Sequence, residues 1–244
     1  MTYCVAVRLE EGLVLASDSR TSAGVDDLSI YSKMHHFNTR DDRFITLLSA
    51  GNLATTQAVT TRLEREIEDA ADGQNLNDFD HLDQIARYVG DVSSGIQTNF
   101  AGQAEQTSQM MQASFILAGQ IEGRAHEAFL IYPQGNYIAA SPDKPFLQIG
   151  ETKYGKPILD RIIEPSISLE RAGRCALVSM DAAIRANLTV GPPIELLLYQ
   201  RDQLHSPKRV RFEADDPYLL SLRSAWSDGL NQLFLTLPRF DWES

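Results

Sequence analysis

The sequence predicts an α+β fold, a four-layer αββα sandwich in which two β-sheets pack face to face and helices cover both outer faces. Two observations support this prediction. Runs of strand-like residues alternate with pairs of helix-like runs, and the strand-like runs are long enough for two sheets. No repeat and no linker rich in glycine, proline or serine divides the chain, so we expect one domain over residues 1–244.

The first two strands are expected to form a hairpin. Residues 2–9 and 13–18 alternate between larger and smaller side chains, and residues 10–12 provide a turn that contains a glycine. Thr2 lies on the face with the smaller side chains, a face that can pack against a second layer.

The length of the turn decides what lies opposite Thr2. A turn of two residues places Ser19 there, and a turn of three residues places Arg20 there. In either register Asp18 lies within two residues of the position that pairs with Thr2. A single aspartate at a strand end is commonly an exposed residue, but the neighbours of Asp18 favour a site.

The other expected elements follow the same patterns. Strands are expected at residues 33–37, 43–50, 113–120, 128–132, 137–140, 194–199 and 208–212. Helices are expected after the N-cap Asn52, at residues 78–100 with interruptions near Gly90 and Gly95, at residues 153–163 and 169–188, and from Leu219 to Leu233. The glutamine-rich residues 103–112 are expected to form a polar loop.

The bulk composition excludes several classes of function. The net charge of −11 argues against binding to nucleic acid or to an anionic membrane, because both require a basic surface. The two cysteines, Cys4 and Cys175, lie in apolar segments and are expected to be reduced core residues. No segment resembles a membrane span or a targeting signal, so we expect a cytoplasmic protein.

Gly51 stands between a strand and a helix. The unpaired N–H groups at a helix N-terminus favour negative charge, so this position can stabilise an oxyanion, or it can simply make a tight turn. The neighbouring His35 and His36 are expected to be structural residues, because adjacent strand residues point to opposite faces and no further metal ligand follows at a suitable spacing. We therefore expect no metal and no cofactor.

Four short motifs resemble those of proteasome β-type subunits. The motifs are Thr2-Tyr3-Cys4-Val5-Ala6, Gly12-Leu13-Val14-Leu15-Ala16-Ser17-Asp18-Ser19-Arg20, Ser32-Lys33-Met34-His35 and Ala50-Gly51-Asn52. They are similar to the N-terminal threonine, the D-x-R, the K-I-H and the glycine of that family. Within the family the chain looks closest to the bacterial group called Anbu.

This resemblance implies an N-terminal nucleophile hydrolase. Thr2, exposed by removal of Met1, would supply the nucleophile through its hydroxyl and the base through its α-amine. Asp18 and Lys33 would shape the electrostatic field, and the Gly51 N–H would stabilise the oxyanion. The resemblance also assigns accessory roles to Ser19 and Arg20 and a substrate pocket to Thr21, Tyr31 and Ser49.

The chemistry of a threonine agrees with this assignment. A free hydroxyl is unreactive at neutral pH without an adjacent base, and an α-amine with a pKa of about 7.7 to 8.0 is suited to that task. The positive charge of Lys33, held in place by Asp18, would lower the pKa of the α-amine further.

The sequence also departs from the family. Asn187 stands where the family has an aspartate, and Gly150-Glu151-Thr152 replaces a turn that contains a serine. We hypothesise that the Glu151 carboxylate replaces the missing aspartate; the alternative is that Glu151 is a solvated loop residue.

Three functions remain open from the sequence. The first is a threonine-type hydrolase of peptide or protein amides that works in a homo-oligomeric ring or open spiral, with an ATPase or a peptide-modifying enzyme as candidate partners. The second is a catalytically silent assembly subunit. The third is a narrow amidase in a peptide-modification pathway.

Overall fold

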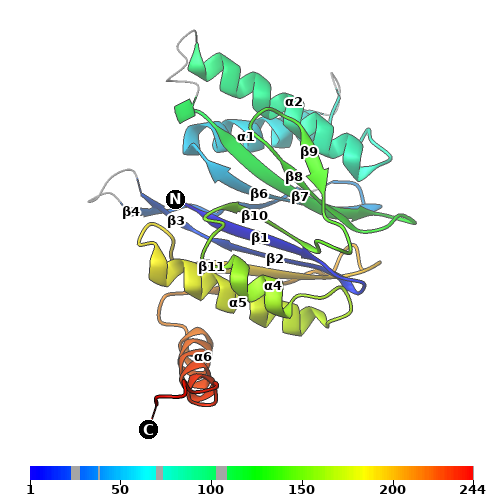
Figure 1. The fold of residues 1–244 in the computed structure, drawn as a ribbon. Helices are drawn as coiled ribbons and strands as arrows, with labels where there is room; N and C mark the ends of the chain where they lie inside the picture. Colours follow the sequence, from blue (N-terminus) through cyan, green and yellow to red (C-terminus); the bar gives the residue numbers. More distant parts are fainter. Residues whose placement is uncertain (23–27, 38, 70–73, 103–108, 244) are drawn as a thin grey trace.

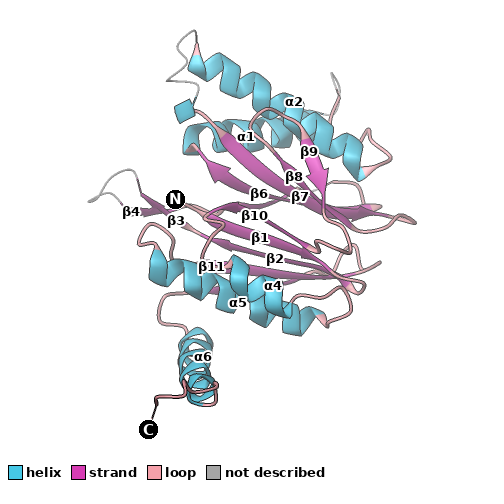
Figure 2. Cartoon of the chain, in the orientation of Figure 1, coloured by secondary structure: helices cyan, strands magenta, loops and turns pink. Residues whose placement is uncertain are grey.

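The computed structural model describes residues 1–22, 28–37, 39–69, 74–102 and 109–243. Two five-stranded antiparallel sheets stack face to face, as Figure 1 shows. Helices cover the outer face of each sheet (Figure 2). The predicted four-layer αββα arrangement is therefore confirmed.

The first sheet has the strand order β10-β1-β2-β11-β12. Its strands are β1 (Tyr3–Arg8), β2 (Gly12–Asp18), β10 (Phe146–Gly150), β11 (Ile194–Gln200) and β12 (Lys208–Phe212). The strand β10 was not predicted. The mostly apolar run at residues 146–149 is short, and Pro145 and Gly150 border it. A run of this length cannot be distinguished from a loop segment by its sequence pattern.

The β1–β2 hairpin uses the shorter of the two predicted turns. Cys4 pairs with Ser17, which leaves two residues in the turn and places Thr2 opposite Ser19. Gly12 has a φ of 151°, and a Cβ at this position would lie 1.9 Å from the main-chain oxygen of Tyr199. Glycine is therefore required where β11 crosses close to the turn.

The second sheet has the strand order β5-β6-β7-β8-β9. Its strands are β5 (Met34–His36), β6 (Arg43–Gly51), β7 (Ala113–Ile121), β8 (Glu127–Ile131) and β9 (Tyr137–Ala139). A separate two-stranded sheet, β3 (Arg20–Ser22) with β4 (Leu28–Ile30), was not predicted from the sequence.

The helices are α1 (Leu53–Asp69), α2 (Leu82–Ala101), α4 (Lys156–Ile162), α5 (Leu169–Ala186) and α6 (Pro217–Leu235). Asn52 is the predicted N-cap of α1, because its Oδ1 accepts a hydrogen bond from the Thr55 N–H at 3.1 Å. Of the polar loop expected at residues 103–112, residues 103–108 lie outside the described part and residues 109–110 are helical.

The expected interruptions of α2 are wrong. The helix is continuous through Gly90 and Gly95. A Cβ at Gly90 would lie 2.1 Å from the main-chain oxygen of Gly135, so this glycine permits the close approach of the β8–β9 turn. At Gly90 the sequence signal for a helix break was in fact a packing requirement, whereas a Cβ at Gly95 would have no atom within 4 Å.

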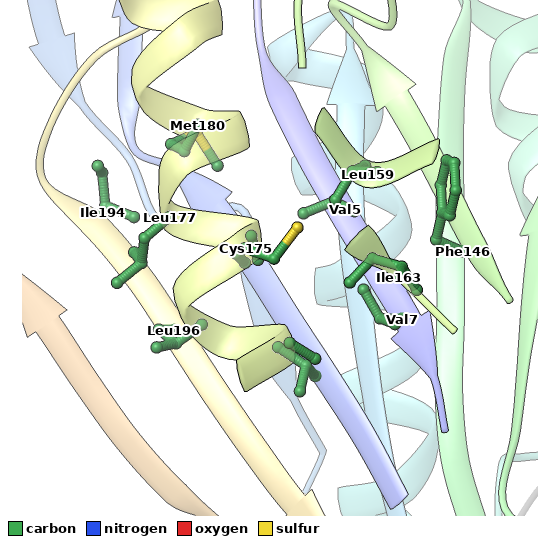
Figure 3. Packing of buried hydrophobic residues seen from close by; sticks show 14 of the residues in the cluster. Val5, Val7, Phe146, Leu159, Ile163, Cys175, Leu177, Met180, Ile194 and Leu196 are labelled. Atoms are coloured by element: carbon green, nitrogen blue, oxygen red, sulfur yellow. The ribbon is translucent and has the colours of Figure 1, made fainter. Parts of the chain in front are cut away.

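Three apolar clusters separate the four layers. Alternate residues of β1 divide between two of them: Val5 and Val7 face α4 and α5, whereas Cys4 and Ala6 face the second sheet. Figure 3 shows Val5, Val7 and Cys175 in the outer cluster. Both cysteines are free and buried. The prediction that the face carrying Thr2 packs against a second layer is confirmed.

The helix α6 packs differently from the predicted amphipathic helix. It lies below α5 in Figure 1, and Leu219 is its only fully buried side chain. Leu230 and Leu233 are exposed, because the helix extends away from the sandwich. Among the helices that the structure describes, none has both the length and the hydropathy needed to cross a bilayer.

Candidate active site

A buried ion pair joins Asp18, at the end of β2, to Lys33. The Lys33 Nζ donates to Asp18 Oδ1 at 2.7 Å and to the Arg20 carbonyl at 2.6 Å. Asp18 is 0% exposed and Lys33 is 6% exposed. Two main-chain N–H groups, from Tyr3 and Gly191, also donate to the carboxylate, at 2.9 Å and 3.1 Å.

These contacts decide the charge state of the aspartate. Burial raises the pKa of Asp18, whereas the Lys33 ammonium and the two N–H groups oppose that rise by stabilising the carboxylate. Desolvation of two charges is offset only where hydrogen bonds satisfy both partners, as they do here. The result is a positive charge fixed close to the start of β1.

Thr2 lies immediately before β1 and is half-buried. Its carbonyl accepts a hydrogen bond from the Glu151 N–H at 2.6 Å. Gly150 has a φ of 82°, and a Cβ there would lie 2.0 Å from the same carbonyl. The end of β10 therefore holds the Thr2 backbone at a separation that only glycine allows.

The N-terminal amine lies in the field of the buried pair. The Met1 ammonium donates to Thr189 Oγ1 at 2.8 Å. Burial lowers the pKa of this amine, the charge of Lys33 lowers it further, and Asp18 partly opposes both effects. The sequence-based expectation concerns the α-amine of Thr2, which is free only after removal of Met1, so the effect of Lys33 on that amine stays a prediction.

Gly51 ends β6 next to the same region. The Asn52 N–H bonds to the Gln112 carbonyl on one side of the strand, and the Ser49 N–H bonds to the Lys33 carbonyl on the other. Because N–H groups alternate between the two edges of a strand, the Gly51 N–H points to the edge occupied by Lys33.

A cavity of about 560 Å³ connects these groups. Its lining includes Thr2, Lys33 and Gly51 together with the predicted pocket residues Thr21, Tyr31 and Ser49. His35 also lines the cavity, where its Nε2 lies 3.2 Å from Ser49 Oγ. Burial lowers the pKa of His35 to about 4, so the imidazole is neutral at neutral pH. From the sequence His35 was expected to be a structural residue, and its position in the cavity lining was not predicted.

The two residues at the altered family positions touch each other. Asn187 Nδ2 donates to Glu151 Oε2 at 3.3 Å, and the Lys153 N–H donates to Oε1 at 3.0 Å. Glu151 is 6% exposed, so it is not a solvated loop residue. The Asn187 Oδ1 accepts from Thr189, the residue that binds the Met1 ammonium.

Ser19 and Arg20 hold neighbouring segments in place. Ser19 Oγ and Ser32 Oγ both donate to Glu195 Oε2, at 3.5 Å and 2.7 Å. Arg20 Nη1 donates to the Leu188 carbonyl at 2.9 Å and packs over Gly191. Arg20 thereby orders the loop whose Gly191 N–H binds Asp18. Glu195 was missed in the sequence because it lies on a distant strand with no motif around it.

A metal centre finds no support in the part of the chain that the structure describes. No group of three or more histidine, cysteine, aspartate or glutamate side chains gathers there at a separation suited to one ion. His36 instead contacts Thr46, with 3.2 Å between His36 Nδ1 and Thr46 Oγ1.

Comparison with known proteins decides the family. The family model of the proteasome subunit matches residues 2–197, and the match begins at Thr2. The chain belongs to the proteasome subunit family. Its fold is accordingly the αββα sandwich of the N-terminal nucleophile hydrolases.

Solved structures place the chain within the Anbu group of this family. It is similar to Anbu (ancestral beta-subunit) from Yersinia bercovieri, with 39% identity over 99% of this chain and 100% of that chain and a TM-score of 0.91. It is also similar to the Anbu complex from Pseudomonas aeruginosa, with 43% identity over 98% of each chain and a TM-score of 0.90. A comparison with functionally curated proteins found no match.

We predict that Asp18→Asn lowers the free energy of unfolding by about 3 to 5 kcal/mol, because Lys33 is left as a buried charge without a counter-charge. Urea denaturation followed by fluorescence measures this loss. Asp160→Asn, which breaks an exposed pair with Lys156, is the matched control and should cost less than about 1 kcal/mol. Equal losses in the two variants would contradict the prediction.

Proposed function

We propose that this protein is a threonine-type peptidase or amide hydrolase whose nucleophile is Thr2 after removal of Met1. The observation that carries this proposal is the buried Asp18–Lys33 pair beside a cavity that Thr2 and Gly51 also line. Membership of a family of proteasome-type peptidases supports it. The substrate is a peptide or protein amide whose side chain occupies the cavity.

The proposed reaction starts with proton transfer inside one residue. The α-amine of Thr2 takes the hydroxyl proton while Oγ1 attacks the substrate carbonyl carbon. The Lys33 charge keeps part of the α-amine population neutral at neutral pH by lowering its pKa. Asp18 keeps Lys33 in place and prevents it from moving into solvent.

The carbonyl oxygen becomes negative in the tetrahedral intermediate. The Gly51 N–H, at the edge of β6 that faces Lys33, stabilises this charge. The ammonium of Thr2 then returns its proton to the leaving amine, which gives an ester between the acyl group and Thr2. Water attacks the ester with the same α-amine as base, and this step releases the acid product and restores the hydroxyl.

We predict that Thr2→Ala abolishes hydrolysis and covalent labelling by electrophiles directed at N-terminal threonine, because Thr2 alone supplies oxygen and amine. Thr2→Ser is the matched control, since it keeps both groups and should keep measurable labelling. Labelling is followed by intact-mass spectrometry, which also shows whether Met1 has been removed. Wild-type activity in Thr2→Ala would exclude Thr2 as nucleophile.

Glu151 is proposed to supply the negative charge that the family obtains from an aspartate. The side chain is buried, and its carboxylate accepts a hydrogen bond from Asn187. The main-chain N–H of the same residue donates to the Thr2 carbonyl. Asn187 keeps the hydrogen-bonding shape of an aspartate but carries no charge. A negative charge here would stabilise the ammonium that forms when the α-amine takes the hydroxyl proton, so its loss is expected to slow the attack.

We predict that Glu151→Gln lowers turnover of a small fluorogenic peptide by about ten- to a hundredfold. Asn187→Ala should have a smaller effect, because the Glu151 carboxylate remains. Glu164→Gln, at an exposed loop position after α4, is the control and should leave turnover unchanged. An unchanged rate in Glu151→Gln would show that its carboxylate has no part in the reaction.

A homo-oligomer is also proposed, and α6 supports it. Leu233, Phe234 and Leu235 are 60%, 72% and 79% exposed, which is an unusual amount of apolar surface for one helix end. The P. aeruginosa relative is described as a helical assembly. This surface would also serve the second candidate function, a catalytically silent assembly subunit.

We predict that light scattering at micromolar concentration gives a mass well above the 27.2 kDa of one chain. Lower ionic strength should shift the mass downward, because the net charge of −11 is then less screened. Phe234→Glu should weaken assembly more than Ile138→Glu, at an exposed apolar position on β9. A single 27.2 kDa species for the wild type would refute the oligomer.

A further inference from the structure

A second cavity of about 570 Å³ lies at the end of the sandwich opposite Thr2. β1 runs between the two regions, since it begins beside Thr2 and its last residue, Arg8, lines this second cavity. The turns β1–β2, β7–β8, β9–β10 and β11–β12 all contribute to its lining. The proposed hydrolysis uses none of these residues.

The charged lining is cationic although the protein is strongly acidic. Three arginines, Arg8, Arg124 and Arg201, face two carboxylates, Glu10 and Asp202. Arg201 is paired with Asp202 at 3.3 Å. Within the described residues, Arg8 and Arg124 form no salt bridge. Two guanidinium groups are therefore available to an anion.

Arg8 is held in a fixed orientation. Its Nε donates to the His126 carbonyl at 3.1 Å and its Nη1 to the Ala140 carbonyl at 3.4 Å. Main-chain carbonyls orient the guanidinium without neutralising its charge. The side chain is half-buried, so little of its conformational freedom remains to be lost when a ligand binds.

His126 adds an unused hydrogen-bond acceptor. The residue is 5% exposed, and its Nε2 lies 2.6 Å from the Leu9 carbonyl. A carbonyl only accepts, so Nε2 carries the proton. Burial and the neighbouring Arg8 lower the pKa of His126, which favours the neutral ring with a lone pair on Nδ1. Nδ1 is buried and has no hydrogen-bond partner among the described residues.

The opposite wall is rigid. Asp202 has a φ of 65°, and Gln120 fixes it through two hydrogen bonds of 2.6 Å and 2.9 Å. Gln120 also donates to the Arg124 carbonyl at 2.7 Å and accepts from the Tyr199 hydroxyl at 2.7 Å. The turns that carry Arg124 and Arg201 are thus held by one buried side chain.

We propose that this cavity binds a phosphate group, either as inorganic phosphate or as a small phosphomonoester. A phosphate carries anionic oxygens for Arg8 and Arg124. Near neutral pH inorganic phosphate also keeps an O–H that can donate to an acceptor such as His126 Nδ1, whereas a phosphomonoester is mostly a dianion without that proton. The cavity is larger than one phosphate, and Leu9, Pro142 and Pro165 give it an apolar wall against which an ester group fits.

Calorimetric titration of the full chain tests this inference, with inorganic phosphate, glycerol 3-phosphate and sulfate as probes. Sulfate has the shape and charge of phosphate but carries no proton at neutral pH, so it cannot donate to His126. We expect phosphate to bind at least about fivefold more tightly than sulfate, since one hydrogen bond contributes roughly 1 kcal/mol. Tighter binding of glycerol 3-phosphate than of phosphate would identify an ester as the ligand, and the reverse would identify free phosphate.

Variants distinguish phosphate binding in this cavity from a general attraction of anions to positive charges on the protein surface. Arg124→Gln removes an exposed charge and should weaken phosphate binding about tenfold or more, as expected for a charge-assisted hydrogen bond. Arg65→Gln, on the exposed face of α1, is the matched control and should bind as the wild type does. His126→Leu should abolish the preference for phosphate over sulfate.

Three results would overturn the proposal. These are no binding of phosphate by the wild type, equal binding of phosphate and sulfate, and equal losses in Arg124→Gln and Arg65→Gln. If His126→Leu does not fold, the comparison of phosphate with sulfate on the wild type still decides. The test needs no enzymatic activity, so it does not depend on the function proposed for Thr2.

Discussion

The burial of the Asp18–Lys33 pair is the constraint on which the rest of the site depends. Removing two charges from water is tolerated only when both are satisfied by hydrogen bonds. The partners come from separate segments: Tyr3 on β1, the Arg20 carbonyl after β2, and Gly191 before β11. These segments must meet at one point, so the pair fixes the relative positions of the strands that surround Thr2.

Close backbone contacts complete this arrangement. Gly150 and Gly51 both have positive φ, and at each a Cβ would overlap a main-chain oxygen, of Thr2 and of Gln112 respectively. The first contact holds the carbonyl of Thr2, and the second sets the end of β6. The ion pair provides the electrostatic field and the glycines allow the close backbone contacts, and neither alone would define the geometry of the site.

Most of the layers could be predicted from the sequence, because the two-residue period of apolar side chains in a strand and the 3.6-residue period in a helix are local signals. The alternation along β1 is an example. Motifs and the hairpin register also predicted that Thr2, Asp18, Lys33 and Gly51 lie close together. In the structure Thr2, Lys33 and Gly51 line one cavity, and Asp18 binds Lys33. The sequence could not predict β10, whose five residues become a strand only by pairing with β1. His35 and Glu195 were missed for a related reason, since their importance arises from neighbours distant in the sequence.

The interior position of β1, between β10 and β2, explains why both of its ends can position the groups of the two proposed sites. It pairs with β10 on one side and β2 on the other, so its main-chain groups are satisfied along its length and it cannot shift without breaking two ladders. The hydrogen-bond ladders of β1 to β10 and β2 begin next to Thr2 and end near Arg8. Each end of β1 combines a fixed backbone with a polar side chain, Thr2 at one end and Arg8 at the other, and the proposed chemistry and the proposed anion binding both require that combination.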